Sequence, residues 1–367
     1  MNKNDVPILL IGLGGIGSYI VNETYGKLKQ EGDIDFLEAL VFDTDEAELS
    51  KLENIPKDSK VQTSTDKSVG YVLERDKNAN MWFPVHPKIL AMNLIKGAGQ
   101  IRAVSRLALR AAMKEGKLNK IQKVKDKLYR LGSNAAEKGV RIVLVSSLMG
   151  GTGSGMFLQI PLYLREVMQS KFSADRIEIQ GVFMLPDVLM GSVNGKEEVN
   201  VYANAYASMK EMNAIIMSLA KEGPTIELEY RPDQITDEAE NKGIGINDWP
   251  YDYCYIYDKE DAKGRNIGEL DEYKHMIADN LYSQVYGPVS DALHSHFINE
   301  IRSIIRKNSK NIFGGLAIGK IIYPYDEICE YITNKAIYEN LKEQLLRIDE
   351  SYKNKLEQYE KDRQSGN

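Results

Sequence analysis

The sequence predicts an α/β fold of the Rossmann type, and two stretches of the chain carry this prediction. Residues 6–11 (VPILLI) form an apolar run that leads into GLGGIG at residues 12–17, and a helical pattern follows. Residues 141–145 (RIVLV) lead in the same way into SSLMGGTGSG at residues 146–155, again before a helical pattern. A buried strand, a glycine-rich turn and a helix N-terminus together form a cradle for phosphate groups.

The composition is that of a globular protein with one large or two smaller domains. The chain has 367 residues, of which 43% are hydrophobic and 27% charged, and its net charge of −6 gives no sign of nucleic-acid binding. Cys254 and Cys329 are too few for a disulfide framework or a zinc cage, which fits a reducing compartment. Because we see no signal peptide and no apolar run of membrane-spanning length, we expect a cytoplasmic protein without a transmembrane segment.

The glycines of both turns are the first candidate ligands for a polyphosphate. Glycine lets the backbone turn sharply and approach a ligand closely, and the helix that follows offers free N–H groups. The second turn adds two hydroxyl donors and is not a Walker A loop, since it lacks the Gly-Lys-Ser/Thr ending. The candidates are Gly12, Gly14, Gly15, Gly17, Gly150, Gly151, Thr152, Gly153, Ser154 and Gly155.

GGTGSG closely resembles the GGGTG(S/T)G signature of the tubulin and FtsZ superfamily. Residues 96–112 (KGAGQIRAVSRLALRAA) resemble a second motif of that superfamily, a GAGxxPxxGRxAA loop that closes over the terminal phosphate. Two residues depart from this motif: Arg102 stands near the family proline and Ser105 replaces the family glycine, so we expect the loop to be stiffened differently. The matching positions are Gly97, Ala98, Gly99, Arg106 and Ala108.

The resemblance covers residues 6–220 by motif order and implies a bacterial tubulin-like protein that binds GTP and GDP with Mg²⁺. It places Asp43 and Asp45, which end the predicted strand 39–45, near the phosphates, where they would act on Mg²⁺ through water. It places Asp187, after the predicted strand 176–186, near the ribose. No side chain is predicted to ligate a metal directly.

The predicted helix 197–220 corresponds to the central core helix of the superfamily, which presents an Asn to guanine and an aromatic ring to stack on it. Asn204 is the match for this Asn, since an amide offers both a donor and an acceptor to the guanine edge. Tyr202 and Tyr206 are both candidates for the ring. The alternative for Asn204 is an amide that is exposed or bonded to its own helix.

A segment near residue 270 is the candidate for catalysis of GTP hydrolysis. In the superfamily an N-x-D-x-x-D/E loop enters the nucleotide site of the next subunit in a head-to-tail filament, so hydrolysis depends on assembly. Here Asn266, Gly268 and Asp271 take those spacings, the middle acid is missing, and Glu269 and Glu272 are neighbouring substitutes. The alternative is a helix N-terminus that is enriched in acids.

The expected domains are residues 1–222, a GTP-binding domain that includes the central helix, and residues 223–367, a smaller, reduced α+β domain. The second ends in a long charged helix at residues 325–363, a surface for self-association or a protein partner.

One alternative function is that of a ThiF-like adenylating enzyme, favoured by GLGGIGS and VFDTDEAELSKL, but this alternative leaves GAGQIRAVSR and GGTGSG unexplained. Another is a tubulin-fold scaffold that binds nucleotide without hydrolysis. The sequence leaves the cellular role open.

Overall fold

The structure, a computed structural model, consists of two compact units, residues 1–318 and residues 319–367. Each unit is described by itself below. The residues that the structure describes are 6–32, 36–131, 139–189, 195–235, 243–260, 263–264, 268–286, 290, 292, 312–316 and 324–366.

The first unit is built on a parallel sheet of seven strands in the order β3-β2-β1-β4-β5-β8-β9. Its central strands are buried along their whole length, which explains why they are nearly continuous apolar runs. The predicted Rossmann-like α/β fold is thereby confirmed. The strands are β1 (Ile8–Leu13), β2 (Leu37–Asp43), β3 (Lys60–Gln62), β4 (Val140–Ser147), β5 (Ile177–Met184), β8 (Tyr253–Tyr257) and β9 (Phe313–Gly315).

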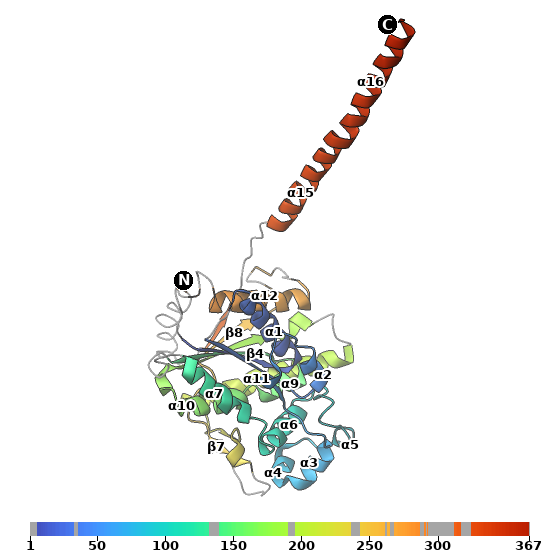
Figure 1. Cartoon of the computed structure of the whole chain (residues 1–367). Helices are drawn as coiled ribbons and strands as arrows, with labels where there is room; N and C mark the ends of the chain where they lie inside the picture. Colours follow the sequence, from blue (N-terminus) through green and yellow to red (C-terminus); the bar gives the residue numbers. More distant parts are fainter. Residues whose placement is uncertain are drawn as a thin grey trace. The chain divides into compact units, whose positions relative to one another are not determined.

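Helices cover both faces of this sheet, as Figure 1 shows. Alternate residues of β1 face opposite layers: Ile8 and Leu10 belong to one core cluster, and Leu9 and Ile11 belong to the other. The first cluster includes apolar side chains of α1 (Gly14–Gln30) and α12 (Leu270–Val285). The second includes those of α6 (Arg102–Lys114), α7 (Asn119–Leu131), α10 (Gln159–Gln169) and α11 (Gly195–Leu219).

The helices α1 and α12 pack against each other in parallel. Glu23 contacts His275 and Lys27 contacts Asp279, each at 2.7 Å, so residue numbers rise in the same direction along both helices. The Tyr282 hydroxyl, further along α12, donates to Glu31 at 2.9 Å. The first turns of α1 and α12 therefore lie at the same edge of the sheet.

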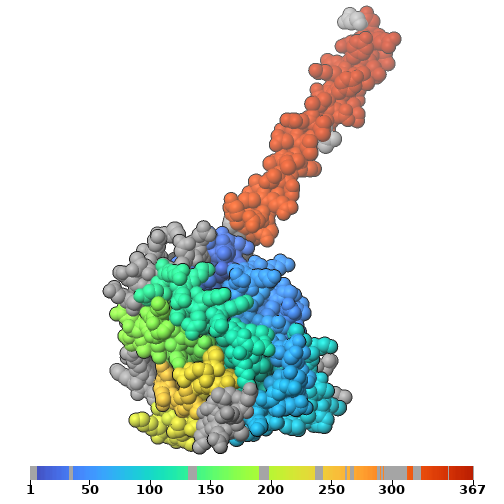
Figure 2. Space-filling model, turned by 60° about the horizontal axis from the view of Figure 1, so that its bottom comes forward, coloured from blue at the N-terminus to red at the C-terminus, as the bar shows by residue number. Residues whose placement is uncertain are grey.

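Short elements fill the region between β2 and α6. They enclose a third apolar cluster around Leu107 and Phe83. Figure 2 shows that the yellow surface around β6 and β7 borders the blue-to-teal surface of residues 60–115. The short helices of this region are α2 (Glu46–Ser50), η1 (Lys57–Ser59), α3 (Val69–Arg75), α4 (Lys77–Trp82) and α5 (Pro87–Leu90). Later in the chain come α9 (Gly151–Met156), η2 (Ala174–Arg176), η3 (Pro186–Leu189), η4 (Pro232–Gln234) and the antiparallel pair β6 (Glu227–Leu228) and β7 (Ile244–Gly245).

The second unit contains one long helical run, as the sequence predicts. It comprises α15 (Tyr325–Leu341), a π-helical stretch η6 (Lys342–Leu346) and α16 (Arg347–Gln364). A row of exposed apolar side chains recurs at every seventh residue, namely Tyr331, Tyr338, Leu345, Tyr352 and Tyr359. In the part of the chain that the structure describes, no helix is both long and apolar enough to cross a membrane.

The segment after residue 222 contributes to the sheet of the first unit. Strand β8 pairs with β5 and strand β9 pairs with β8, both in parallel, so they extend the sheet that begins with β1. The expected boundary at residue 222 thus falls inside the first compact unit. Whether residues 223–367 act as a separate functional domain stays a prediction.

Candidate functional site

The strand order reverses between β1 and β4, and both glycine-rich turns lie at this point. From β1 the chain continues to β2 and β3 on one side, whereas β4, β5 and β8 follow on the other. In open parallel sheets ligands bind at such a switch point, outside the carboxyl ends of the strands. We call the space between residues 12–17 and residues 150–155 the switch-point crevice.

The first turn combines tightly packed glycines with one open position. A Cβ on Gly17 would lie 2.3 Å from the carbonyl oxygen of Val145, and one on Gly12 would lie 2.5 Å from the Cα of Ser18. Gly14 starts α1 with a φ of +71°, a conformation that favours glycine. A Cβ on Gly15 would meet nothing nearer than 3.7 Å, so this glycine borders the open space.

The second turn is already helical from Gly151, five residues before the predicted helix start. Gly151, Gly153 and Gly155 allow close packing, because an added Cβ would lie within 2.7 Å of neighbouring atoms in each case. At Gly150, in contrast, no atom lies within 4 Å of an added Cβ. Gly150 is therefore the glycine of this turn that has open space beside it.

The two hydroxyls of the second turn have different surroundings. Thr152 Oγ1 lies 3.0 Å from Thr44 Oγ1. This contact brings Thr152 next to residues 43–45 at the end of β2, which we call the acidic turn. The Ser154 hydroxyl is fully buried and donates to the carbonyl oxygen of Gly150 within its own turn. Thr152 is therefore the hydroxyl that the structure places beside the crevice.

The acidic turn holds one buried carboxyl group. Asp43 is 4% exposed, and its Oδ1 accepts a hydrogen bond of 3.0 Å from the backbone N–H of Asp45. Burial raises the pKa of Asp43 to about 6, and the nearby carboxylates of Asp45 and Glu48 add to this rise. The Asp45 side chain caps α2 by accepting from the N–H of Ala47 at 2.8 Å. Asp43 is thus a buried acid that a cation would stabilise in its ionised form.

The GAG loop at residues 97–99 rests on the second glycine-rich turn. Gly97 and Gly99 have φ values of +89° and +54°, and Ala98 is buried in the third apolar cluster. The two departures from the family motif make the ties between the segments. Arg102 donates to the carbonyl oxygen of Ser154 at 3.0 and 3.2 Å, and Ser105 Oγ donates to that of Thr152 at 3.2 Å.

Asn204 joins the same two segments from α11. Its side-chain Nδ2 donates to the carbonyl oxygens of Gln100 and Met149, both at 2.9 Å, and the residue is 8% exposed. This tether to two distant segments is neither the exposed nor the helix-bonded amide considered as the alternative for Asn204. Base reading by its carbonyl oxygen stays a prediction. The roles of Gln100, Met149 and Thr44 are missed by sequence reasoning, because each depends on a contact with a distant segment.

The two tyrosines on α11 differ in their contacts. Tyr202 is half-exposed, and its hydroxyl donates to Asp187 Oδ1 at 2.6 Å, which joins two predicted site residues. Tyr206 is 69% exposed and lies under the Lys210 ammonium group, 5.7 Å from its ring centre. The structure therefore pairs Tyr202 with the predicted ribose contact.

The candidate catalytic acids form the first turn of α12. Glu269 and Glu272 cap each other reciprocally, and Asp271 forms an ion pair of 2.5 Å with Lys274. Gly268 has a φ of +150°, and Asn266 lies outside the described residues. This capping is the alternative that the sequence offers for these acids. Because α1 and α12 pack in parallel, the first turn of α12, which carries these acids, lies at the same sheet edge as Gly14.

Arg106 lines a cavity that Ser154 and Gly155 of the second glycine-rich turn also border, whereas no residue of the first turn lines it. Its guanidinium lies 4.3 Å from the ring centre of Trp82, in a cavity that Gln159 also lines. In the described part of the chain, no hydrogen bond or ion pair joins this guanidinium to residues 12–17 or 97–99. The predicted role of Arg106 at the terminal phosphate therefore stays a prediction.

Comparison with known proteins identifies one family. The model of a family described as tubulin-like matches residues 9–341 of the chain. Comparison with curated proteins finds no match.

Several solved structures have low similarity to the chain. A GTPγS-form protofilament of TubZ from Bacillus thuringiensis serovar israelensis has a TM-score of 0.40 at 15% identity, over 77% of this chain and 56% of TubZ. CetZ from Methanosaeta thermophila has a TM-score of 0.43 at 13% identity, over 82% and 59% of the two chains. The GDP-bound monomer of CetZ1 from Haloferax volcanii has a TM-score of 0.42 at 17% identity, over 82% and 73%. The chain thus spans less than two thirds of the first two proteins.

Proposed function

The chain belongs to the tubulin-like family, and from this membership we propose that it binds GTP and GDP in the switch-point crevice. The observation that carries the proposal is the position of the two glycine-rich turns. Both follow neighbouring strands at the point where the strand order reverses, and each leaves one glycine, Gly15 or Gly150, open to the crevice.

The phosphates would be held mainly by backbone groups. The first N–H groups of α1 have no side-chain cap, and the positive end of the helix dipole favours an anion there. Gly15 and Gly150 leave room for phosphate oxygens, and the Thr152 hydroxyl adds a donor or acceptor. Tyr202 and Asp187, which are bonded to each other, would border the sugar and the base.

The acidic turn fits a magnesium ion that is bound with the nucleotide. Such an ion needs one or two carboxylates, because phosphates and waters complete its shell, and it neutralises charge on the phosphates. Asp43 has the raised pKa of a buried acid, and no lysine or arginine among the described residues pairs with it. We assign Asp43, with Asp45 beside it, to hold this ion through water.

We also propose that the protein self-associates head-to-tail into filaments and hydrolyses GTP within them. The catalytic acids would be Asp271, Glu269 and Glu272. Turnover per subunit should then rise with protein concentration, and the Asp271→Ala, Glu269→Ala double variant should bind GTP without hydrolysing it. Full activity in that variant would remove this segment from catalysis. Binding without turnover at any concentration would favour a non-hydrolysing scaffold.

The exposed heptad row of the C-terminal unit is the proposed surface for a protein partner or for assembly. If so, removal of residues 324–367 should leave nucleotide affinity unchanged, because every predicted nucleotide contact lies in the first unit. Sedimentation of the shortened chain with GTP would show whether assembly is lost.

Mass spectrometry of the nucleotide released from purified protein tests the central proposal. GDP or GTP is the expected result. AMP or ATP would instead support the adenylating enzyme that the GLGGIGS stretch also resembles. Addition of each nucleotide to nucleotide-free protein, followed by calorimetry, would check the result.

A further inference from the structure

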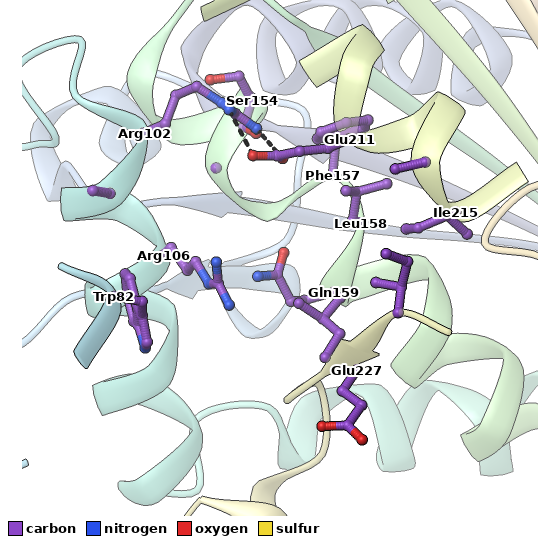
Figure 3. A pocket seen from close by; sticks show the side chains of 15 residues that line it. Trp82, Arg102, Arg106, Ser154, Phe157, Leu158, Gln159, Glu211, Ile215 and Glu227 are labelled. Atoms are coloured by element: carbon purple, nitrogen blue, oxygen red, sulfur yellow. Dashed lines mark hydrogen bonds and ion pairs between the residues drawn. The ribbon is translucent and has the colours of Figure 1, made fainter. Parts of the chain in front are cut away.

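A second cavity, of about 450 Å³, lies between α6, the start of α10 and α11, with β6 on a further side (Figure 3). This volume is within the range of small-molecule sites. We call it the α6 cavity. The residues that matter for its chemistry are Trp82, Arg106, Phe157, Gln159, Ile215 and Leu228.

Arg106 is a cation in this cavity without a close counter-charge. Its guanidinium stacks on the ring of Trp82, and no ion pair or hydrogen bond joins it to any described residue. The carboxylate of Glu211, on the same cavity wall, is bonded to Arg102 at 2.5 and 3.1 Å. Burial lowers the pKa of Arg106, and the carboxylates of Glu211 and Glu229 act against this shift from a distance.

Arg110, one helical turn further along α6, differs from Arg106 because it has carboxylate partners. Its guanidinium donates to both oxygens of Asp76, at 2.6 and 3.2 Å, and it also pairs with Glu229. The chain therefore supplies carboxylates to the buried Arg110 and none to the partly buried Arg106.

Gln159 converges with Arg106 on the same space. This residue is 6% exposed, and Figure 3 shows its amide and the Arg106 guanidinium pointing toward each other across the cavity. No hydrogen bond occupies the Gln159 amide in the described part of the chain. A guanidinium and an amide together can hold a carboxylate with several charge-assisted hydrogen bonds.

The remaining wall defines the rest of the ligand. Phe157, Leu158, Ile215 and Leu228 present apolar surface, while Glu227 at the exposed rim would repel a second anionic group. We propose that the α6 cavity binds a small organic carboxylate that has one anionic end and an apolar body. The cavity shares Ser154 and Gly155 with the second glycine-rich turn, but this proposal does not rest on the nucleotide site proposed above.

Trp82 provides a direct readout of binding. The chain has two tryptophans, so Trp249→Phe leaves Trp82 as the single indole. This protein is titrated with octanoate and phenylacetate, and separately with their neutral counterparts octanamide and phenylacetamide. We expect a saturable change in Trp82 fluorescence with the carboxylates, and affinity for the amides at least about tenfold lower, the effect of losing one charge-assisted hydrogen bond.

Three variants assign the binding to the cavity. Arg106→Gln and Gln159→Leu should each weaken octanoate binding, whereas Arg75→Gln should leave it unchanged. Arg75 is the matched control, since it is an exposed arginine that lies 3.7 Å over the ring of Tyr71, outside the cavity. Calorimetry measures the same affinities without relying on Trp82 fluorescence. This second method is needed because the Arg106 guanidinium, which stacks on Trp82, affects the emission of its indole.

Three results would overturn the proposal. They are equal affinity for amides and carboxylates, no saturable binding of either carboxylate up to millimolar concentration, and unchanged affinity in a folded Arg106→Gln variant. If Arg106→Gln fails to fold, two tests still decide whether the proposal holds. One is the comparison of carboxylates with amides on the parent protein, and the other is the affinity of the Gln159→Leu variant for octanoate.

Discussion

The switch-point crevice and the α6 cavity lie on neighbouring elements but are built from different groups. The crevice is formed by backbone, with Gly15 and Gly150 leaving room and the first turn of α1 offering N–H groups. The cavity is formed by side chains, above all Arg106 and Gln159. A backbone site suits a ligand with many identical oxygens, such as a polyphosphate, whereas a side-chain site can select one anionic group on an apolar body.

The two regions share a wall. Arg102 lines the α6 cavity and also donates to the carbonyl oxygen of Ser154 in the second glycine-rich turn. Ser105, on the same helix, bonds to Thr152 in that turn. Substitutions in the two regions should nevertheless have separable effects, because the open glycines and the free guanidinium are different groups.

The largest expected effect is on nucleotide binding in the crevice. Gly150→Val should remove detectable binding of GTP and GDP without unfolding the protein, because an added Cβ there has no atom within 4 Å and the side chain would fill the space that the phosphates need. Gly315→Val, at a glycine on β9 that is equally open, is the control. Gly151→Val should instead disturb the fold, since its Cβ would lie 2.7 Å from the backbone nitrogen of Ile101. Calorimetry with each folded variant measures the effect, and normal GTP affinity in Gly150→Val contradicts the site.

The next effect separates Arg106 from Arg110 by their contributions to stability. Arg110→Met should lower the free energy of unfolding by about 3 kcal/mol, because it removes the guanidinium from the buried Asp76 and from Glu229 and leaves Lys114 as the cation beside Asp76. Arg106→Met should cost less than about 1 kcal/mol, since it removes a desolvated charge along with a ring contact. Denaturant unfolding of both variants tests this, and equal losses would mean that Arg106 has a structural partner.

A smaller effect concerns Asp43 and pH. The pKa of this buried carboxyl is raised to about 6, so its ionised form is disfavoured in the folded state and the wild type gains stability as pH falls through this value. Asp43→Asn should therefore be more stable than the wild type at pH 7, by at most about 3 kcal/mol. The difference should shrink as pH is lowered from about 7 to about 4, and thermal unfolding across this range measures it. A constant difference would show that burial does not control this carboxyl.

The smallest effect tests the tether on α11. Asn204→Ala removes two hydrogen bonds that hold the GAG loop and the second glycine-rich turn, which is worth about 1 to 2 kcal/mol in stability. If the tether is its whole role, GTP and ATP affinities should fall together. A selective loss of GTP affinity would instead show that Asn204 reads the base. Asn200→Ala, at an exposed position of the same helix, is the control.

Sequence patterns predict the parts of the site that depend on neighbours along the chain. The apolar runs before residues 12 and 146 predict β1 and β4, and the glycine strings after them predict two helix starts at a parallel sheet edge. The acids near residue 270 show the limit of this reasoning. Their spacing resembles a catalytic loop, but a capping box needs the same residue types, and the structure shows Glu269 and Glu272 capping each other.

The sequence by itself determined the α/β class, the buried strands and the positions of the glycine-rich turns, because strand periodicity and glycine strings are local properties. Only the tertiary structure decided which glycines are open, since Gly150 and Gly151 are alike in sequence but differ in what lies beside them. It also decided that Arg102 ties α6 to the second turn while Arg106 is left without a counter-charge. Both are arginines on one helix, and their roles follow from carboxylates and carbonyl oxygens that other segments bring to them.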